Sequence, residues 1–139
     1  MDVAILEDEE PYFHYSATLR IFGQIDDPDG ISSRLGLRPT HVHRRGDRAG
    51  PRSPPFEHDM WSYTAPVAEE RPLAVHVSTL WSHIRAHRDY LVGLKRNCAV
   101  DVFLGYRSSS HTAGLELPPD CLTMFVELNV PLGLSIIVT

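Results

Sequence analysis

The chain has 139 residues, of which 42% are hydrophobic and 22% are charged, and its formal net charge is −5. This composition is that of a folded globular domain, and it excludes disordered, collagen-like and disulfide-scaffold chains. No apolar run approaches the roughly 20 residues of a membrane-spanning helix, and the negative charge disfavours nucleic acid as a partner. We therefore expect one domain that contacts neither a membrane nor a nucleic acid.

An acidic leader is predicted over residues 1–12, followed by a single domain over residues 13–139. The leader contains four consecutive acids from Glu7 to Glu10 and no basic residue. A secretory signal would need a basic segment before an apolar one. We therefore expect a cytoplasmic location.

The first predicted strand covers residues 16–22, where apolar and polar side chains alternate. Ala17, Leu19 and Ile21 share one side, so that side is expected to lie in the core. Aspartates and Pro28 follow, which are typical of a helix N-terminus. We predict a short helix there, ending at Gly36.

Further elements follow from the same patterns. Residues 40–43 and 60–64 are the second and third predicted strands. Residues 73–95 have apolar side chains at steps of three and four, which predicts one long amphipathic helix. Its histidines are expected at the boundary between core and solvent. These histidines are His76, His83 and His87.

The rest of the chain is predicted to hold three more strands and one helix. The strands cover residues 98–106, 113–117 and 132–138, and the helix covers residues 122–128. The complete order is βαββαββαβ, which indicates an α+β domain with an antiparallel or mixed sheet and helices packed on one face. Such a domain is related to split βαβ, ferredoxin-like folds. The first and last thirds follow a similar order of elements, and whether they arose by duplication stays open.

A basic and proline-rich segment interrupts this pattern. Residues 34–52 contain six arginines and one aspartate, a net charge of +5 that leaves −10 for the rest of the chain. Residues 46–58 have prolines and glycines but no hydrophobic period, which predicts a mobile loop. An anionic partner would explain the local charge, and a solvated loop is the alternative.

Several short motifs occur in a fixed order along the chain. They are the Ala17–Phe22 strand, the Asp-Pro helix with its Leu35–Thr40 exit, the Arg45-Gly46-Asp47 turn, the Trp61 strand, the long helix, the Val102–Tyr106 strand, Gly114–Leu117 with Pro118, and the terminal Leu-x-Leu-x-Ile strand. In this order they resemble a bacterial family known as domain-of-unknown-function family 4279. The resemblance covers nearly all of the chain after the leader. It implies a small bacterial protein with no assigned activity.

The turn from Arg44 to Asp47 is the strongest candidate binding element. Arg44 and Arg45 supply donors suited to anions, and Gly46 lets the backbone approach a ligand. In the alternative interpretation, Asp47 pairs with an arginine and caps the turn.

A pocket over the sheet is a second candidate site. Its residues would be Arg20, His43, Asp47, Trp61 and Asp101. Trp61 has a competing interpretation as a core residue, because a tryptophan in strand spacing is commonly buried.

Histidines offer a third candidate site, for a transition metal. His41 and His43 would share a strand face, and His58 precedes the next strand, an arrangement that can bind such metals. A chance pairing is the alternative, because the chain has eight histidines. We predict neither a metal nor a cofactor.

The sequence has none of the short catalytic motifs that can be recognised locally. Phosphate loops, Cys-x-x-Cys pairs, His-Glu-x-x-His and Gly-x-Ser-x-Gly are missing. We therefore expect a non-catalytic binding module, including the partner-neutralising (immunity) type, that binds a protein or a small anionic ligand. A small-ligand enzyme or sensor with a pocket over the sheet is the alternative, and the oligomeric state stays open.

Overall fold

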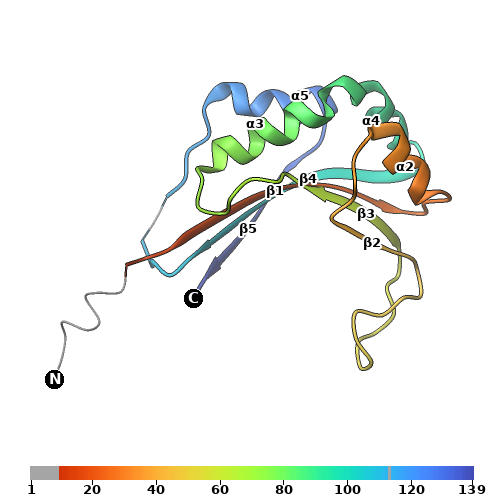
Figure 1. Cartoon of the computed structure of the whole chain (residues 1–139), viewed down its shortest axis with the longest axis horizontal. Coiled ribbons are helices and arrows are strands. Elements are labelled where there is room, and N and C mark those ends of the chain that lie inside the picture. The colour runs from red at the N-terminus through yellow and green to blue at the C-terminus, as the bar shows by residue number, and fades with distance from the viewer. Residues whose placement is uncertain (1–9, 113) are drawn as a thin grey trace.

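A computed structural model describes residues 10–112 and 114–139, so most of the predicted leader lies outside the described residues. Its strands form one mixed sheet in the order β2-β3-β1-β4-β5. Figure 1 shows the helices gathered on one face of this sheet, which confirms the predicted α+β class. The strands are β1 (Phe13–Gly23), β2 (His41–His43), β3 (Asp59–Thr64), β4 (Cys98–Ser108) and β5 (Leu132–Val138). The helices are α2 (Pro28–Leu35), α3 (Leu73–Ile84), α4 (Arg88–Leu94) and α5 (Thr123–Leu128), with 3₁₀ turns at Arg85–His87 and Pro119–Leu122.

Strand β1 is the centre of the sheet. It pairs with β4 in antiparallel register from Phe13↔Ser108 to Gly23↔Cys98, and with β3 along its second half. Every second side chain of β1 enters the core, as the alternation predicts. The inward residues Ala17, Leu19 and Ile21 are fully buried.

Two helical connections cross over β1 and β3. Helix α2 joins β1 to β2, with the antiparallel β3 between them, and α3 with α4 joins β3 to β4, with β1 between them. Both connections are split βαβ units, so the predicted relation to ferredoxin-like folds is confirmed. Helix α5 then leads to β5, which lies beside β4 and runs parallel to it.

The short helix α2 forms where the sequence predicts it. The Asp27 carboxylate accepts a hydrogen bond from the backbone N–H of Gly30 at 3.1 Å, and Pro28 occupies the first turn. The helix ends at Gly36, whose φ of 67° lies in the left-handed region that glycine tolerates best.

The strand predicted at residues 113–117 does not form over residues 114–117, so that prediction was wrong. Both sides of β4 are already occupied, by β1 and by β5. The segment therefore cannot pair with β4, and it runs as a connection to the 3₁₀ turn before α5. The described elements therefore follow the order βαββαβαβ. The last third of the chain lacks the strand at residues 114–117 that would have made its order of elements similar to that of the first third.

The single long helix predicted over residues 73–95 was also wrong, because it is broken at Arg85–His87. A continuous helix would place Arg88 on the buried stripe, where an unpaired charge is costly. After the break, the Arg88 guanidinium lies near the surface, 2.8 Å from Asp89 Oδ1, and donates to the Glu127 carbonyl at 3.1 Å. The apolar stripe then resumes at Leu91, which is fully buried.

His76 lies inside the core, and the expected boundary position was wrong for this histidine. Its side chain on α3 is only 1% exposed, and its Nε2 lies 3.1 Å from the Arg71 carbonyl. Its Nδ1 and the buried Tyr106 hydroxyl have no hydrogen-bond partner among the described residues. Burial lowers the pKa of His76 by disfavouring the charged imidazolium.

This burial predicts a pH-dependent stability. The unfolded chain binds a proton at His76 below a pH of about 6.5, whereas the folded chain resists protonation there. The free energy of unfolding should therefore fall as the pH drops from about 6.5 towards the lower pKa of the folded state. Urea unfolding of His76→Gln should show less of this loss than the wild type. The partly exposed His87→Gln is the matched control, and an equal loss in both variants would contradict the prediction.

Candidate binding face

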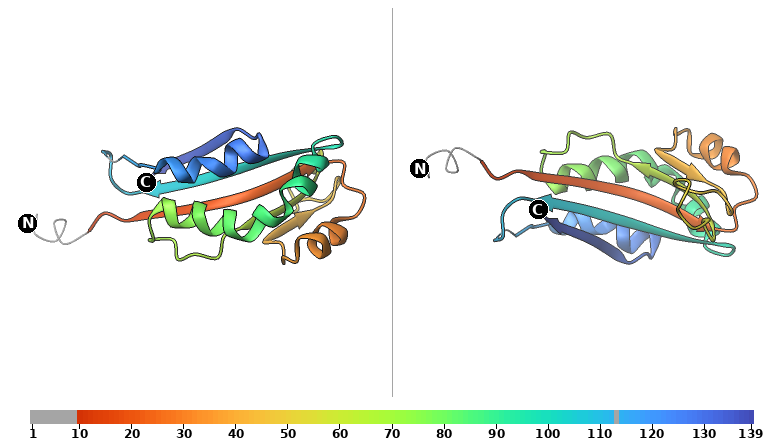
Figure 2. Two further views of the ribbon diagram at one scale, coloured as in Figure 1. Left: turned by 90° about the horizontal axis from the view of Figure 1, so that it is seen from above. Right: turned by 90° about the horizontal axis from the view of Figure 1, so that it is seen from below.

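The face of the sheet opposite the helices carries no helix among residues 10–112 and 114–139 (Figure 2). Figure 2, seen from below, shows β1, β4 and β5 on this side without a helix over them. Its side chains are those that alternate with the core residues, and most are half-exposed. We call this surface the open face. It includes Ser16, Thr18, Arg20, Phe22, Met60, Asp101, Phe103 and Ser135.

An ion pair occupies the middle of the open face. Arg20 on β1 and Asp101 on β4 are directly opposite in register, and two hydrogen bonds of 2.8 and 2.7 Å join them. The Arg20 guanidinium also lies 4.3 Å from the centroid of the Phe103 ring. The hydrogen bonds that the Arg20 guanidinium donates to Asp101 raise the pKa of Arg20. The two charges therefore satisfy each other.

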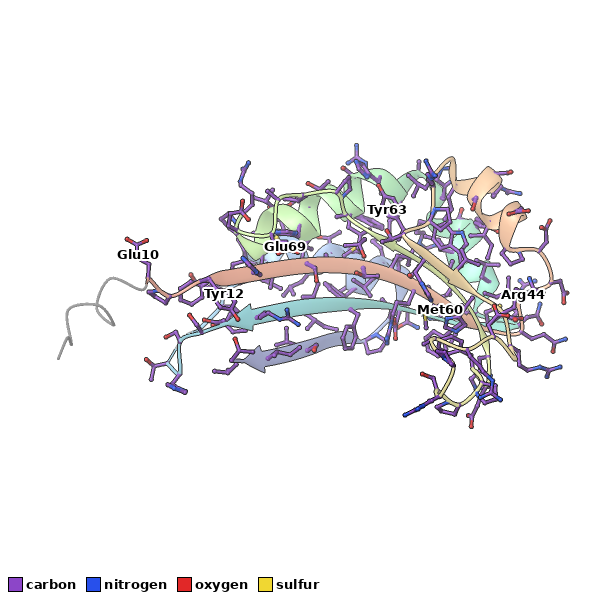
Figure 3. The ribbon with its side chains drawn as sticks, turned by 60° about the horizontal axis from the view of Figure 1, so that its bottom comes forward. Glu10, Tyr12, Arg44, Met60, Tyr63 and Glu69 are labelled. Atoms are coloured by element: carbon purple, nitrogen blue, oxygen red, sulfur yellow. The ribbon has the colours of Figure 1, made fainter. Side chains whose placement is uncertain are left out.

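The loop between β2 and β3 borders the open face. Figure 1 shows it projecting on the side of the sheet away from the helices, and Figure 3 shows Met60 and Arg44 where it joins the sheet. Its two arms are tied together, because Gly46 donates to the Phe56 carbonyl at 2.9 Å and Phe56 donates to the Asp47 carbonyl at 2.8 Å. Gly46 has a φ of 94°, which requires a glycine.

Asp47 caps this turn, which is one part of the alternative interpretation, but its carboxylate forms no ion pair with an arginine among the described residues. Its Oδ2 accepts a hydrogen bond from the backbone N–H of Arg44 at 2.8 Å, and its own N–H donates to the Arg44 carbonyl at 3.0 Å. The Arg44 guanidinium lies instead 3.4 Å from Asp59. The Asp47 carboxylate is therefore engaged in holding the turn.

Asp59 anchors the base of the loop. This carboxylate is buried and accepts hydrogen bonds from the backbone N–H groups of Ile25 at 2.9 Å and Arg45 at 2.8 Å. The bond from Arg45 and then the bond from Ile25 lower its pKa, and burial opposes them. Local sequence patterns do not reveal this role of Asp59, because its partners Ile25 and Arg45 lie in two separate loops.

The loop carries arginines without an acidic partner in the described part of the chain. Arg45 and Arg52 form no ion pair there, and Arg48 is used internally, donating to the Ser53 carbonyl at 2.6 Å. All three side chains are exposed or nearly so. Positive charge is thus available to a partner beside the open face.

Two of the three histidines proposed as metal ligands form a pair. His41 Nε2 lies 2.8 Å from His43 Nδ1, and the His43 ring stacks on Phe56 with centroids 3.6 Å apart. Burial and, to a lesser degree, the neighbouring His41 lower the pKa of His43. No group of three or more metal-ligating side chains comes together within residues 10–112 and 114–139, so His58 does not complete a site with this pair.

The five-residue pocket expected over the sheet does not assemble, because Trp61 lies on the other face. Trp61 is fully buried beneath the helices and donates to the Ser32 hydroxyl of α2 at 3.0 Å. Arg20, Asp101 and His43 do share the open face.

A hollow that the sequence analysis missed lies at the far end of the open face from the loop. It measures about 290 Å³, and its lining includes His14, Ser16, Glu69, Gly105, Arg107 and Ser135. His14 Nδ1 lies 3.2 Å from Glu69 Oε2. A side chain at position 105 would place its Cβ 2.3 Å from the Ser16 hydroxyl oxygen, so glycine keeps the floor open. The pattern of β1 extends to His14, but the pairing with Glu69 has no local sequence pattern.

The fold and the open face define a single-domain α+β protein with one side of its sheet exposed. The family model described as "Domain of unknown function (DUF4279)" matches residues 13–139, and the chain belongs to this family. No curated protein and no solved structure matches it. None of the helices in the described part of the chain is long and apolar enough to cross a membrane.

The anchoring role of Asp59 predicts a large effect of removing its charge. In Asp59→Asn, the side-chain amide would face one of the two backbone N–H donors, and the free energy of unfolding should fall by about 2–4 kcal/mol. Because the pKa of Asp59 is lowered in the folded state, the difference from wild type should shrink as the pH falls below about 4. Urea unfolding at neutral and acidic pH measures both effects.

The matched control is Asp47→Asn, which changes an exposed carboxylate in the same loop. It caps a surface turn, so its cost should stay at about 1 kcal/mol or less. Equal costs for the two variants would contradict the anchoring role of Asp59.

Proposed function

We propose that this protein is a non-catalytic binding module that holds a protein partner against its open face and the adjoining loop. The observation that carries the proposal is the one-sided covering of the sheet. The open face presents the half-exposed Phe22, Phe103 and Met60 around the central Arg20. Aromatic residues, methionine and arginine are the types enriched at protein interfaces.

The charge of the loop supports an acidic surface on the partner. Arg45 and Arg52 have no ion pair in the described part of the chain, while the whole chain has a net charge of −5. Local complementarity of this kind speeds association and fixes the orientation of a complex.

The chemistry of the open face favours binding over catalysis. Arg20 and Asp101 are held to each other by two hydrogen bonds, so neither serves as a free base or a free anion-binding group. A broad face flanked by a loop is suited to covering the working surface of another protein. This supports the partner-neutralising type among the binding roles.

Affinity capture with matched variants tests the proposal. Wild-type protein should retain a specific partner from an extract of its source cells. Met60→Glu on the open face and Arg45→Glu on the loop should each reduce the retained amount at least tenfold, which corresponds to about 1.4 kcal/mol. Ser82→Glu on the helix side and Arg96→Glu after α4 are controls, since both positions are exposed. Retention that is the same for all four variants would refute the proposal.

The hollow around His14 supports a second candidate function, a small-ligand enzyme or sensor. It combines an imidazole next to a carboxylate with two hydroxyls and the guanidinium of Arg107. Arg107 is exposed and forms no ion pair with any described residue. Guanidinium groups bind carboxylates and phosphates in a planar, two-pronged geometry.

Titrations of the ¹⁵N-labelled protein with inorganic phosphate and with succinate distinguish this candidate. Binding in the hollow should shift the amide signals of Ser16, Gly105 and Arg107 at millimolar ligand. Arg107→Ala should abolish these shifts, and Arg96→Ala should leave them unchanged. Signals that do not move with either anion would exclude a site for these ligands.

A further inference from the structure

Strand β5 forms an edge of the sheet that lacks the usual protection. It pairs with β4 on one side and has no neighbouring strand on the other within the described residues. Its sequence from Leu132 to Val138 contains no charged residue and no proline. Natural edge strands are commonly guarded by charges, prolines or bulges, because unpaired backbone groups recruit other strands.

Exposed apolar residues occur both on this strand and on α5. Figure 2, seen from above, shows α5 beside the β5 edge. We call the exposed apolar residues on the helix side of β5, on α5 and in the 3₁₀ turn before α5 the edge patch. It consists of Leu122 (41% exposed) in the turn, Val126 (78%) on α5, and Leu132 (43%), Leu134 (37%), Ile136 (60%) and Val138 (47%) on β5. Exposed apolar side chains along an unprotected strand edge favour an interaction with another chain.

The direction of the free backbone groups follows from one hydrogen bond. The backbone N–H of Thr139 donates to the Ser108 carbonyl at 3.0 Å, so it points towards β4. Successive residues of a strand direct their N–H and C=O groups to opposite sides. The backbone groups of Leu132, Leu134, Ile136 and Val138 therefore point outwards, away from β4.

We propose that β5 pairs with β5 of a second copy of this chain, antiparallel, about a two-fold axis at Ser135. In this register Leu134 lies opposite Ile136 of the partner subunit, and Leu132 lies opposite Val138 of the partner subunit. These are the residues whose backbone groups point outwards, so each pair exchanges two hydrogen bonds.

The side chains of β5 also complement themselves in this register. Gly133 lies opposite Ile137 of the partner subunit, so the absence of a side chain on one strand makes room for a bulky one on the other. No charged residue of β5 meets a like charge, because the strand has none. An isologous interface requires this self-complementarity, whereas an unrelated partner does not.

In this pairing the helices of both copies lie on the same side of the joined sheet. The open faces of both copies therefore lie together on the opposite side. The two sheets become one continuous sheet across the seam. On the open side the interface involves Gly133, Ser135 and Ile137 of β5. The binding role proposed for the open face rests instead on Arg20, Met60 and the loop between β2 and β3, which lie on other strands of the sheet.

Sedimentation equilibrium and directed disulfide formation test the proposal. Wild-type protein should reach twice the mass of one chain as its concentration rises, and Ile136→Lys should stay at the mass of one chain. The control Ser82→Lys, an exposed position on α3, should behave as the wild type does. A wild type that remains a single chain at its highest soluble concentration would overturn the proposal.

A cysteine at the axis tests the register. Residues at a non-hydrogen-bonded antiparallel pair have Cα atoms about 4.5 Å apart, within the range of a disulfide. Ser135→Cys should therefore form a linked dimer under mild oxidation, seen on a non-reducing gel. Ser16→Cys, on the open face away from the edge, should not, and the wild type controls for the free Cys98 and Cys121. No linked dimer from Ser135→Cys would overturn this register.

Discussion

The pairing of β1 with β4 along the whole length of both strands is the constraint on which the rest of the structure depends. Every residue from Phe13 to Gly23 has a partner on β4. This long pairing fixes which side chains of β1 and β4 point into the core. A slip of one residue would turn the inward side chains of the slipped strand outwards and its outward side chains inwards. Leu19 and Val102 are therefore buried as a pair, and Arg20 and Asp101 emerge as a pair on the other side.

The open face results from the register of β1 with β4 and from the side of the sheet on which the helical connections lie. Helices α2, α3 and α4 return over the same side of the sheet, and α5 joins them there. Among the described residues, the loop between β2 and β3 projects on the other side (Figure 1). Asp59 holds the base of that loop to the segment after β1, so the arginines are displayed at a defined place. Binding chemistry therefore concentrates on the side that packing leaves free.

Local sequence patterns predicted those features that depend on neighbours along the chain. The alternation over residues 16–22 and 98–106 identified the inward residues, and Pro28 with Gly36 bounded α2. The same rules failed at residues 113–117 and at residues 85–87. In the first case β4, the strand that precedes the segment, already had a neighbour on each side, and in the second a charged residue had to leave the buried stripe. Both failures concern positions that distant elements control.

For the candidate site, the amino-acid sequence established which residues alternate with the core, and so placed Arg20 and Asp101 on one face. It also established that the loop is basic. Three-dimensional packing determined the contacts between distant residues. Trp61 is buried and donates to Ser32, and Asp59 accepts hydrogen bonds from two loops. His14 lies beside Glu69. The physical reason is that side-chain periodicity is a property of a short segment. Contacts between residues far apart in the chain depend instead on which strands become neighbours.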